Sequence, residues 1–244
     1  MPGLHLLHCL IYALNSRDSI LDYRTLAPQG KHHQRTTPVP AAGSRSGILY
    51  AEFNIMQRNK ILNLFTHYRA RHPEEAAVVD RISAFVEANA DCFSRELAIG
   101  HITGSAWILD STGTRALLTH HKKLDIWVQL GGHADGDPDV AQVAYREAIE
   151  ESGLAGLEFV DRVLFDIDIH QIPARGHEAA HYHYDCRFLF RAVDDDYTVS
   201  DESHDLLWVP LADMCSVTSE PSITRMVTKT RILMRASSSA GKSG

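Results

Sequence analysis

The chain contains 244 residues with a mass of 27.2 kDa, a size that suggests one substantial domain or one domain with an appendage. Its formal net charge of −7 argues against a general nucleic-acid-binding protein, because contacts with phosphates need clustered Lys and Arg residues. It has no run of 18 or more apolar residues, so we expect no membrane span. Its four scattered cysteines form no CxxC pair, which favours a cytoplasmic protein over a zinc-binding or disulfide-stabilised one.

Residues 1–55 differ in composition from the rest of the chain. The apolar segment 4–14 is too short to cross a bilayer and lacks the basic start and the cleavage site of a secretory signal. Residues 28–47 are rich in Pro, Gly, Ser and Arg, a composition typical of a flexible segment. We therefore expect residues 1–55 to be a disordered or dispensable extension, with Met56 as a candidate natural start.

Two helices are predicted between residues 56 and 97. In the first, apolar residues return with helical spacing at Ile61, Leu62, Leu64, Phe65 and Tyr68. The second begins at Pro73, which two acidic residues follow, and runs to about Asn89. We expect this pair to pack against the core domain; covering a substrate pocket is the alternative role.

From residue 101 the pattern changes to short strands. Residues 105–110 and 115–121 flank a predicted hairpin turn at 111–114. Segments 163–170 and 181–190 both alternate between apolar and polar residues. The second segment carries four polar residues on one face: His181, His183, Asp185 and Arg187. A strand at 206–209, a helix at 221–236 and a flexible tail at 237–244 complete the expected elements.

An acidic helix follows a Gly-Gly pair within residues 131–154. At about 100° of rotation per residue, Glu147, Glu150 and Glu151 fall within an arc about 100° wide. Like charges at this spacing destabilise a helix, and a bound hard cation such as Mg²⁺ would offset their repulsion. Arg146 neutralises part of the charge. A solvated acidic surface with no ligand is the alternative interpretation.

The same stretch resembles the Nudix box of the Nudix hydrolases, G-x5-E-x7-R-E-U-x-E-E-x-G-U, in which U is aliphatic. Gly132 supplies the first glycine, and residues 146–154 (REAIEESGL) match the second half in register. Pro138 replaces the first glutamate of the box, which weakens the match without removing the residues expected at the metal.

This resemblance implies an α/β/α sandwich with a mixed curved sheet, formed by a Nudix hydrolase domain at residues 98–236. It also implies cleavage of the pyrophosphate bond of a nucleoside diphosphate linked to another group. Mg²⁺ or Mn²⁺ would be held by Glu147, Glu150, Glu151 and the carbonyl of Gly131, and Arg146 would orient the carboxylates. Homodimers are common in the family, so a homodimer is possible here.

The sequence does not single out one general base or one set of substrate contacts. Glu150 and Glu151 are candidate bases within the box. Outside the box, the candidates for substrate binding or proton transfer are His133, Lys122, His183, Asp185 and Glu202. The loop 171–180 is a further candidate for contact with substrate.

Two other functions fit the same fold. A Nudix-fold module could bind a nucleotide or nucleotide sugar without cleaving it, and Pro138 points in that direction. A diphosphate isomerase would need a reactive cysteine, whereas Cys186 falls on the aromatic face of its strand.

Overall fold

The computed structural model describes residues 45–122, 124–201 and 203–240, which belong to one compact unit. Most of the expected N-terminal extension, residues 1–44, lies outside the described residues. Residues 45–55 are helical, so the first helix begins well before the expected position at Met56. Within the described ranges, no helix combines the length and apolar character that a membrane crossing requires.

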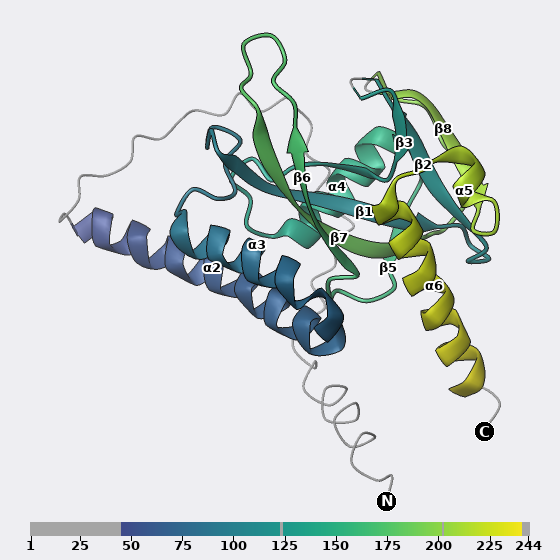
Figure 1. Cartoon of the computed structure of the whole chain (residues 1–244), viewed down its shortest axis with the longest axis horizontal. Coiled ribbons are helices and arrows are strands. Elements are labelled where there is room, and N and C mark those ends of the chain that lie inside the picture. Colours follow the sequence, from purple (N-terminus) through teal and green to yellow (C-terminus); the bar gives the residue numbers. More distant parts are fainter. Residues whose placement is uncertain (1–44, 123, 202, 241–244) are drawn as a thin grey trace, which may run out of the picture. The chain divides into compact units, whose positions relative to one another are not determined.

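Eight strands form one mixed sheet (Figure 1). They are β1 (Gly100–Leu109), β2 (Arg115–His121), β3 (Ile126–Val128), β4 (Leu130–His133), β5 (Leu157–Phe159), β6 (Asp166–Ile172), β7 (His181–Ala192) and β8 (Ser203–Pro210). β1 is central: it pairs in parallel with β7, and its other edge pairs antiparallel with β4 and then with β2. β5 and β6 pair with β7, while β3 and β8 pair with β2.

β1 is longer than the sequence pattern indicated. It begins at Gly100 instead of residue 105, and all ten of its residues are buried. A strand covered on both faces does not need to alternate, so period-two analysis finds only part of it. The predicted turn at 111–114 is confirmed, and the buried Asp110 carboxylate anchors it by accepting the N–H groups of Thr114 and Arg115. β6 begins at Asp166, three residues after the predicted start.

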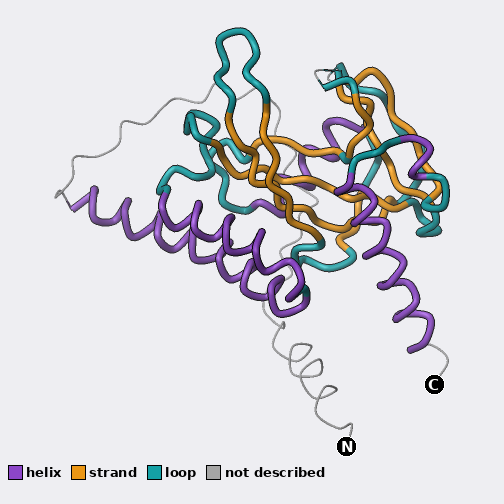
Figure 2. Tube along the Cα trace, viewed as in Figure 1, coloured by secondary structure: helices purple, strands orange, loops and turns teal. Residues whose placement is uncertain are grey.

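Three helices pack against one face of the sheet, which we call the α4 face, and two of them, α2 and α3, run side by side (Figure 2). They are α2 (Arg45–Arg71), α3 (Ala76–Ala88), which the short helix η2 (Pro73–Glu75) precedes, and α4 (Val140–Ser152). The predicted helical pair is therefore present, and the ring of Phe85 on α3 stacks on Tyr184 of β7 at 3.7 Å. A Cβ atom at Gly104 would lie 2.7 Å from the Val140 carbonyl oxygen, so glycine allows α4 to pack closely on β1.

The opposite face, which we call the α6 face, is covered in part by α5 (Met214–Val217) and α6 (Pro221–Ala240). Trp107 lies in this second core and donates its indole N–H to Thr230 at 2.9 Å. α6 reaches Ala240, four residues into the segment expected to be a flexible tail. Helices on both faces of a mixed sheet confirm the predicted α/β/α sandwich. The rest of the α6 face carries polar side chains of β1, β6 and β7.

Candidate metal centre and active site

Local signals at both ends of α4 fix the position of its acidic residues. Asp139 caps the N-terminus by accepting the N–H of Gln142 at 3.2 Å. Gly153 ends the helix in the left-handed conformation, with φ of 64°, and its N–H donates to Ile149 at 2.9 Å. The buried stripe of the helix contains Val143, Ala144 and Ala148, and it faces the sheet. The register of residues 146–151 against β4 is therefore fixed.

Glu147 lies against the backbone of β4. A Cβ atom at Gly132 would be 2.5 Å from the carboxyl carbon of Glu147 and still closer to its Oε2. A side chain at this position would push the Glu147 carboxylate away from β4. Arg146 holds Glu147 from the other side, with its Nη2 3.1 Å from Oε1, and its Nη1 lies 3.7 Å from Asp137. The role of Arg146 in orienting the carboxylates stays a prediction.

Glu151 reaches the same strand one helical turn later. The N–H of Gly131 donates to Glu151 Oε2 at 3.4 Å, and a Cβ atom at Gly131 would lie 2.7 Å from the Cα of Ser105. Backbone contacts therefore require glycine at position 131, whereas at position 132 an added Cβ would meet the Glu147 side chain. Glu150 differs from the other two carboxylates because its side chain is exposed.

The donor set at this edge of β4 suits a hard cation. It consists of carboxylate oxygens and backbone carbonyls, the ligands that Mg²⁺ and Mn²⁺ prefer. The fit is supported by the space beside Gly132, which a side chain would fill and which the Glu147 carboxylate occupies. Among the described residues, Glu147, Glu150 and Glu151 do not form a group with ligand atoms within 4.8 Å of one another.

Asp185 is buried in a hydrogen-bond network on the α6 face. Its Oδ1 accepts the hydroxyls of Thr103 and Ser105 at 2.9 and 2.7 Å. Its Oδ2 accepts Gln129 Nε2 at 3.2 Å and Arg187 Nε at 2.7 Å. With 1% of its surface exposed, Asp185 contributes to the structure of the sheet here and offers no exposed oxygen to a substrate.

The histidine candidates lie together on the α6 face. The rings of His183 and His133 are 5.1 Å apart. Burial lowers the pKa of His183 to about 2, with further lowering from neighbouring histidines, of which His170 contributes most. A ring with so low a pKa accepts a proton weakly near neutral pH, which argues against His183 as the general base.

Of the two remaining candidates, Lys122 and Glu202, the structure describes Lys122 alone. Lys122 is exposed and donates its ammonium to the carbonyl of Asp201 at 2.6 Å, so a backbone group already engages it. Glu202 lies outside the described residues.

An ion network that the sequence did not reveal joins β6, β7 and α6. Asp166 is fully buried and accepts hydrogen bonds from Arg187 at 3.1 Å and from Arg225 at 2.7 Å. Lys229 Nζ lies 2.7 Å from both Asp166 and Glu75. The alternating pattern placed Asp166 on the polar side of its strand, but its partners on α6 lie about sixty residues further along the chain. This network ties α6 to the sheet.

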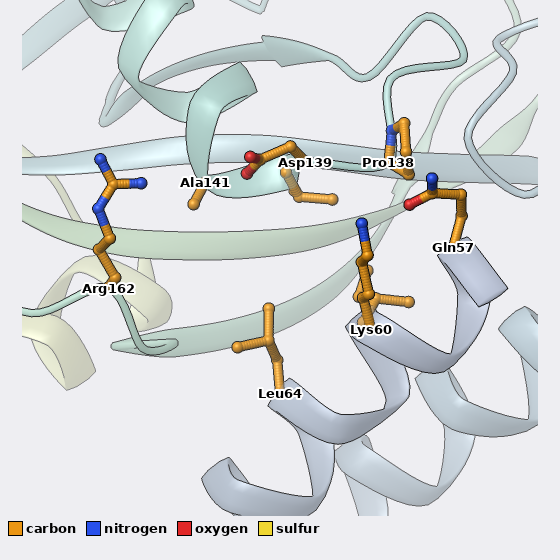
Figure 3. A pocket seen from close by; sticks show the side chains of 9 residues that line it. Gln57, Lys60, Leu64, Pro138, Asp139, Ala141 and Arg162 are labelled. Atoms are coloured by element: carbon orange, nitrogen blue, oxygen red, sulfur yellow. The ribbon is translucent and has the colours of Figure 1, made fainter. Parts of the chain in front are cut away.

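A cavity of about 360 Å³ lies between α2 and the start of α4 (Figure 3). Lys60 and Leu64 of α2 line one side, and Pro138 and Asp139 line the other. Pro138, which replaces the first glutamate of the box, thus borders this cavity. The first helix of the pair, α2, therefore lines a hollow beside the box in addition to packing on the core.

Comparisons with known proteins agree on one domain type. A family model described as the NUDIX domain matches residues 101–229, more than half of the chain. A search of curated proteins found no match. Similar solved structures include an Ap4A hydrolase of C. elegans in a binary complex, with 19% identity over 55% of this chain and 98% of that chain and a TM-score of 0.46. Others are a NUDIX-family hydrolase from Clostridium perfringens (22% identity, 55% and 97% covered, TM-score 0.42) and the Nudix hydrolase RenU from M. smegmatis (18%, 56% and 88%, 0.43).

Proposed function

Because the chain belongs to the Nudix family, we propose that it is a metal-dependent hydrolase that cleaves the pyrophosphate bond of a nucleoside diphosphate linked to another group. One observation supports this proposal above the others: the Gly-Gly pair of β4 makes room for Glu147 and binds Glu151 through a backbone N–H. The carboxylates of Glu147 and Glu151 are thereby held at one edge of the sheet.

The residues of the box have different proposed roles. Glu147, Glu150, Glu151 and the carbonyl of Gly131 would hold Mg²⁺ or Mn²⁺, which when bound stabilises negative charge on the phosphates and lowers the pKa of a water molecule. Arg146 keeps Glu147 in place. Glu150, which is exposed and not held against β4, accepts the proton of the attacking water, with Glu151 as the alternative base. Water oxygen then bonds to phosphorus as the bond to the bridging oxygen breaks.

The test is a panel of nucleoside diphosphate derivatives incubated with Mg²⁺ or Mn²⁺, with products identified by mass. Glu150→Gln and Glu151→Gln should each lower kcat by ~10²-fold or more, because such groups act largely in the transition state. Glu158→Gln, at an exposed glutamate of β5 outside the box, is the matched control and should keep the wild-type rate. A near wild-type rate for Glu151→Gln on a confirmed substrate would overturn its assignment.

A nucleotide-binding module without hydrolysis is the second candidate. Glu147, Glu150 and Glu151 do not converge within 4.8 Å, and Pro138 replaces a glutamate of the box. Saturable binding of a panel member in the presence of Mg²⁺ and Mn²⁺, without product release, would favour this candidate over the hydrolase.

A further inference from the structure

Five histidines gather on the α6 face of the sheet, away from α4. They are His101 of β1, His133 of β4, His170 of β6, and His181 and His183 of β7, with ring centroids of neighbouring members 4.9 to 5.4 Å apart. Strand register produces the cluster, because His183 lies opposite His101 in the parallel pair and opposite His170 in the antiparallel pair. Four strands therefore direct imidazole rings into one patch.

Three of these histidines have the spacing of metal ligands. One ring nitrogen from each of His101, His181 and His183 lies within 4.8 Å of the other two. The Nε2 atoms of His181 and His183 are 3.3 Å apart. Two imidazole nitrogens that bind one tetrahedral zinc ion at about 2.0–2.1 Å are themselves about 3.3–3.4 Å apart. This pair is therefore already at ligand spacing, and a ring nitrogen of His101 lies within 4.8 Å of both.

The hydrogen bond of His181 leaves the correct nitrogen for a metal. Its Nδ1 lies 2.9 Å from the carbonyl oxygen of Ala179. A carbonyl only accepts, so in the neutral ring Nδ1 carries the proton and Nε2, which faces His183 and lies 3.7 Å from Glu178 Oε1, keeps its lone pair. Metal-binding histidines are commonly held in this way by a second hydrogen bond to a carbonyl.

His101 lacks the partner that a buried polar ring normally has. Only 2% of its surface is exposed, and within the described part of the chain neither ring nitrogen has a hydrogen-bond partner. Buried polar groups are almost always hydrogen-bonded, so an unsatisfied one needs an explanation. A metal ion bound to His101 would supply the missing partner.

We propose that His101, His181 and His183 bind a divalent transition-metal ion of the Zn²⁺ class, at a site separate from the carboxylates of α4. Imidazole nitrogen suits Zn²⁺, Co²⁺ and Ni²⁺, whereas Mg²⁺ prefers oxygen. Gly132 faces Glu147, and alternation turns the next residue, His133, to the opposite face with the histidines. Three protein ligands would leave the fourth tetrahedral position to water, and two neighbours in the cluster, His133 and His170, are only half-buried.

The experiment uses the full chain, without any affinity tag, stripped with a chelator. Zn²⁺ is titrated calorimetrically in excess Mg²⁺, and Co²⁺ binding is followed by its visible absorption. We expect one Zn²⁺ per wild-type chain and the spectrum of tetrahedral Co²⁺. His181→Gln should weaken Zn²⁺ binding by ~100-fold or more, because it removes one of three ligands.

Two controls separate this site from the other possible ones. His72→Gln alters the second group of potential ligands, formed with Glu74 and Glu75, and should bind Zn²⁺ as the wild type does. Glu151→Gln should also keep Zn²⁺ binding, so the result does not depend on the proposed hydrolysis. The proposal is overturned if the wild type binds no stoichiometric Zn²⁺, or if His72→Gln loses binding while His181→Gln keeps it.

A measurement on the wild type alone covers the case in which the histidine variants do not fold. X-ray absorption of the Zn²⁺-loaded protein should show imidazole nitrogens about 2.0–2.1 Å from the metal. A shell made only of carboxylate and water oxygens would contradict the proposal.

Discussion

Two sets of carboxylates in this domain differ in their burial and in the positive charge around them. Asp166 and Asp185 on the sheet are buried and neutralised by Arg187, with Arg225 adding to the charge around Asp166. The glutamates of α4 lie at a strand edge, where Glu150 is exposed. A buried and neutralised acid contributes to folding, whereas like charges left close together near solvent provide attraction for a cation. The environment of an acid, more than its presence in a polar row, thus indicates its role.

The largest expected effect is on stability, from Asp166→Asn. This change leaves Arg187, Arg225 and Lys229 with too little negative charge in a buried network, and breaking such a network costs about 3–5 kcal/mol. Urea denaturation measures the free energy of unfolding. Asp161→Asn, at an exposed position, should change it by less than about 0.5 kcal/mol. Equal effects of the two variants would refute the distinction between the two sets.

Gly132→Ala should instead reduce activity more than stability. Its Cβ would displace the Glu147 carboxylate, and misplacing a group of the proposed metal centre by about 1 Å can lower the rate by ~10²-fold. Steady-state kinetics on an identified substrate measure the loss. The matched control is Gly156→Ala, whose added Cβ would meet only a Val193 methyl at an ordinary 3.5 Å. Full activity in Gly132→Ala would show that Glu147 does not need this position.

The smallest expected effect is the pH dependence of the unfolding free energy that arises from Asp166, one of the buried carboxylates. Burial alone raises the pKa of Asp166, but the hydrogen bond from Arg225 and the charges of Arg187 and Lys229 outweigh burial and lower it. The stabilisation is therefore present above the unfolded-state pKa of about 3.9 and is lost as the pH falls below it. Unfolding free energies measured from neutral to acidic pH should fall less steeply for Asp166→Asn than for wild type. Parallel curves would argue against this linkage.

The acidic helix and the polar row of β7 could be predicted because their evidence is local. Asp139 and Gly153 mark the ends of α4, and strict alternation places His183 and Asp185 on one face. The pattern could not distinguish their roles: Asp185 proved to be buried among Thr103, Ser105 and Arg187, contacts that only the packed sheet creates.

The remaining features depend on contacts between distant segments. The position of His101 beside His183 requires the parallel register of β1 and β7, which no local pattern encodes. The neutralisation of Asp166 depends on α6 in the same way. Glu147, Glu150 and Glu151 share one helical arc, yet only packing against β4 decides which of them lie along the strand.

The pairing of β1 with β7 also has a consequence for the order of assembly. Facing residues such as Thr103 and Asp185 are 82 positions apart, and this contact encloses β4 and α4 in one large loop. Closing such a loop costs entropy before its contacts form, so this step is expected to come late in folding. During synthesis, every glutamate of the box leaves the ribosome before β7 does. The sheet that supports these glutamates is therefore incomplete until Ala192, the last residue of β7, has emerged.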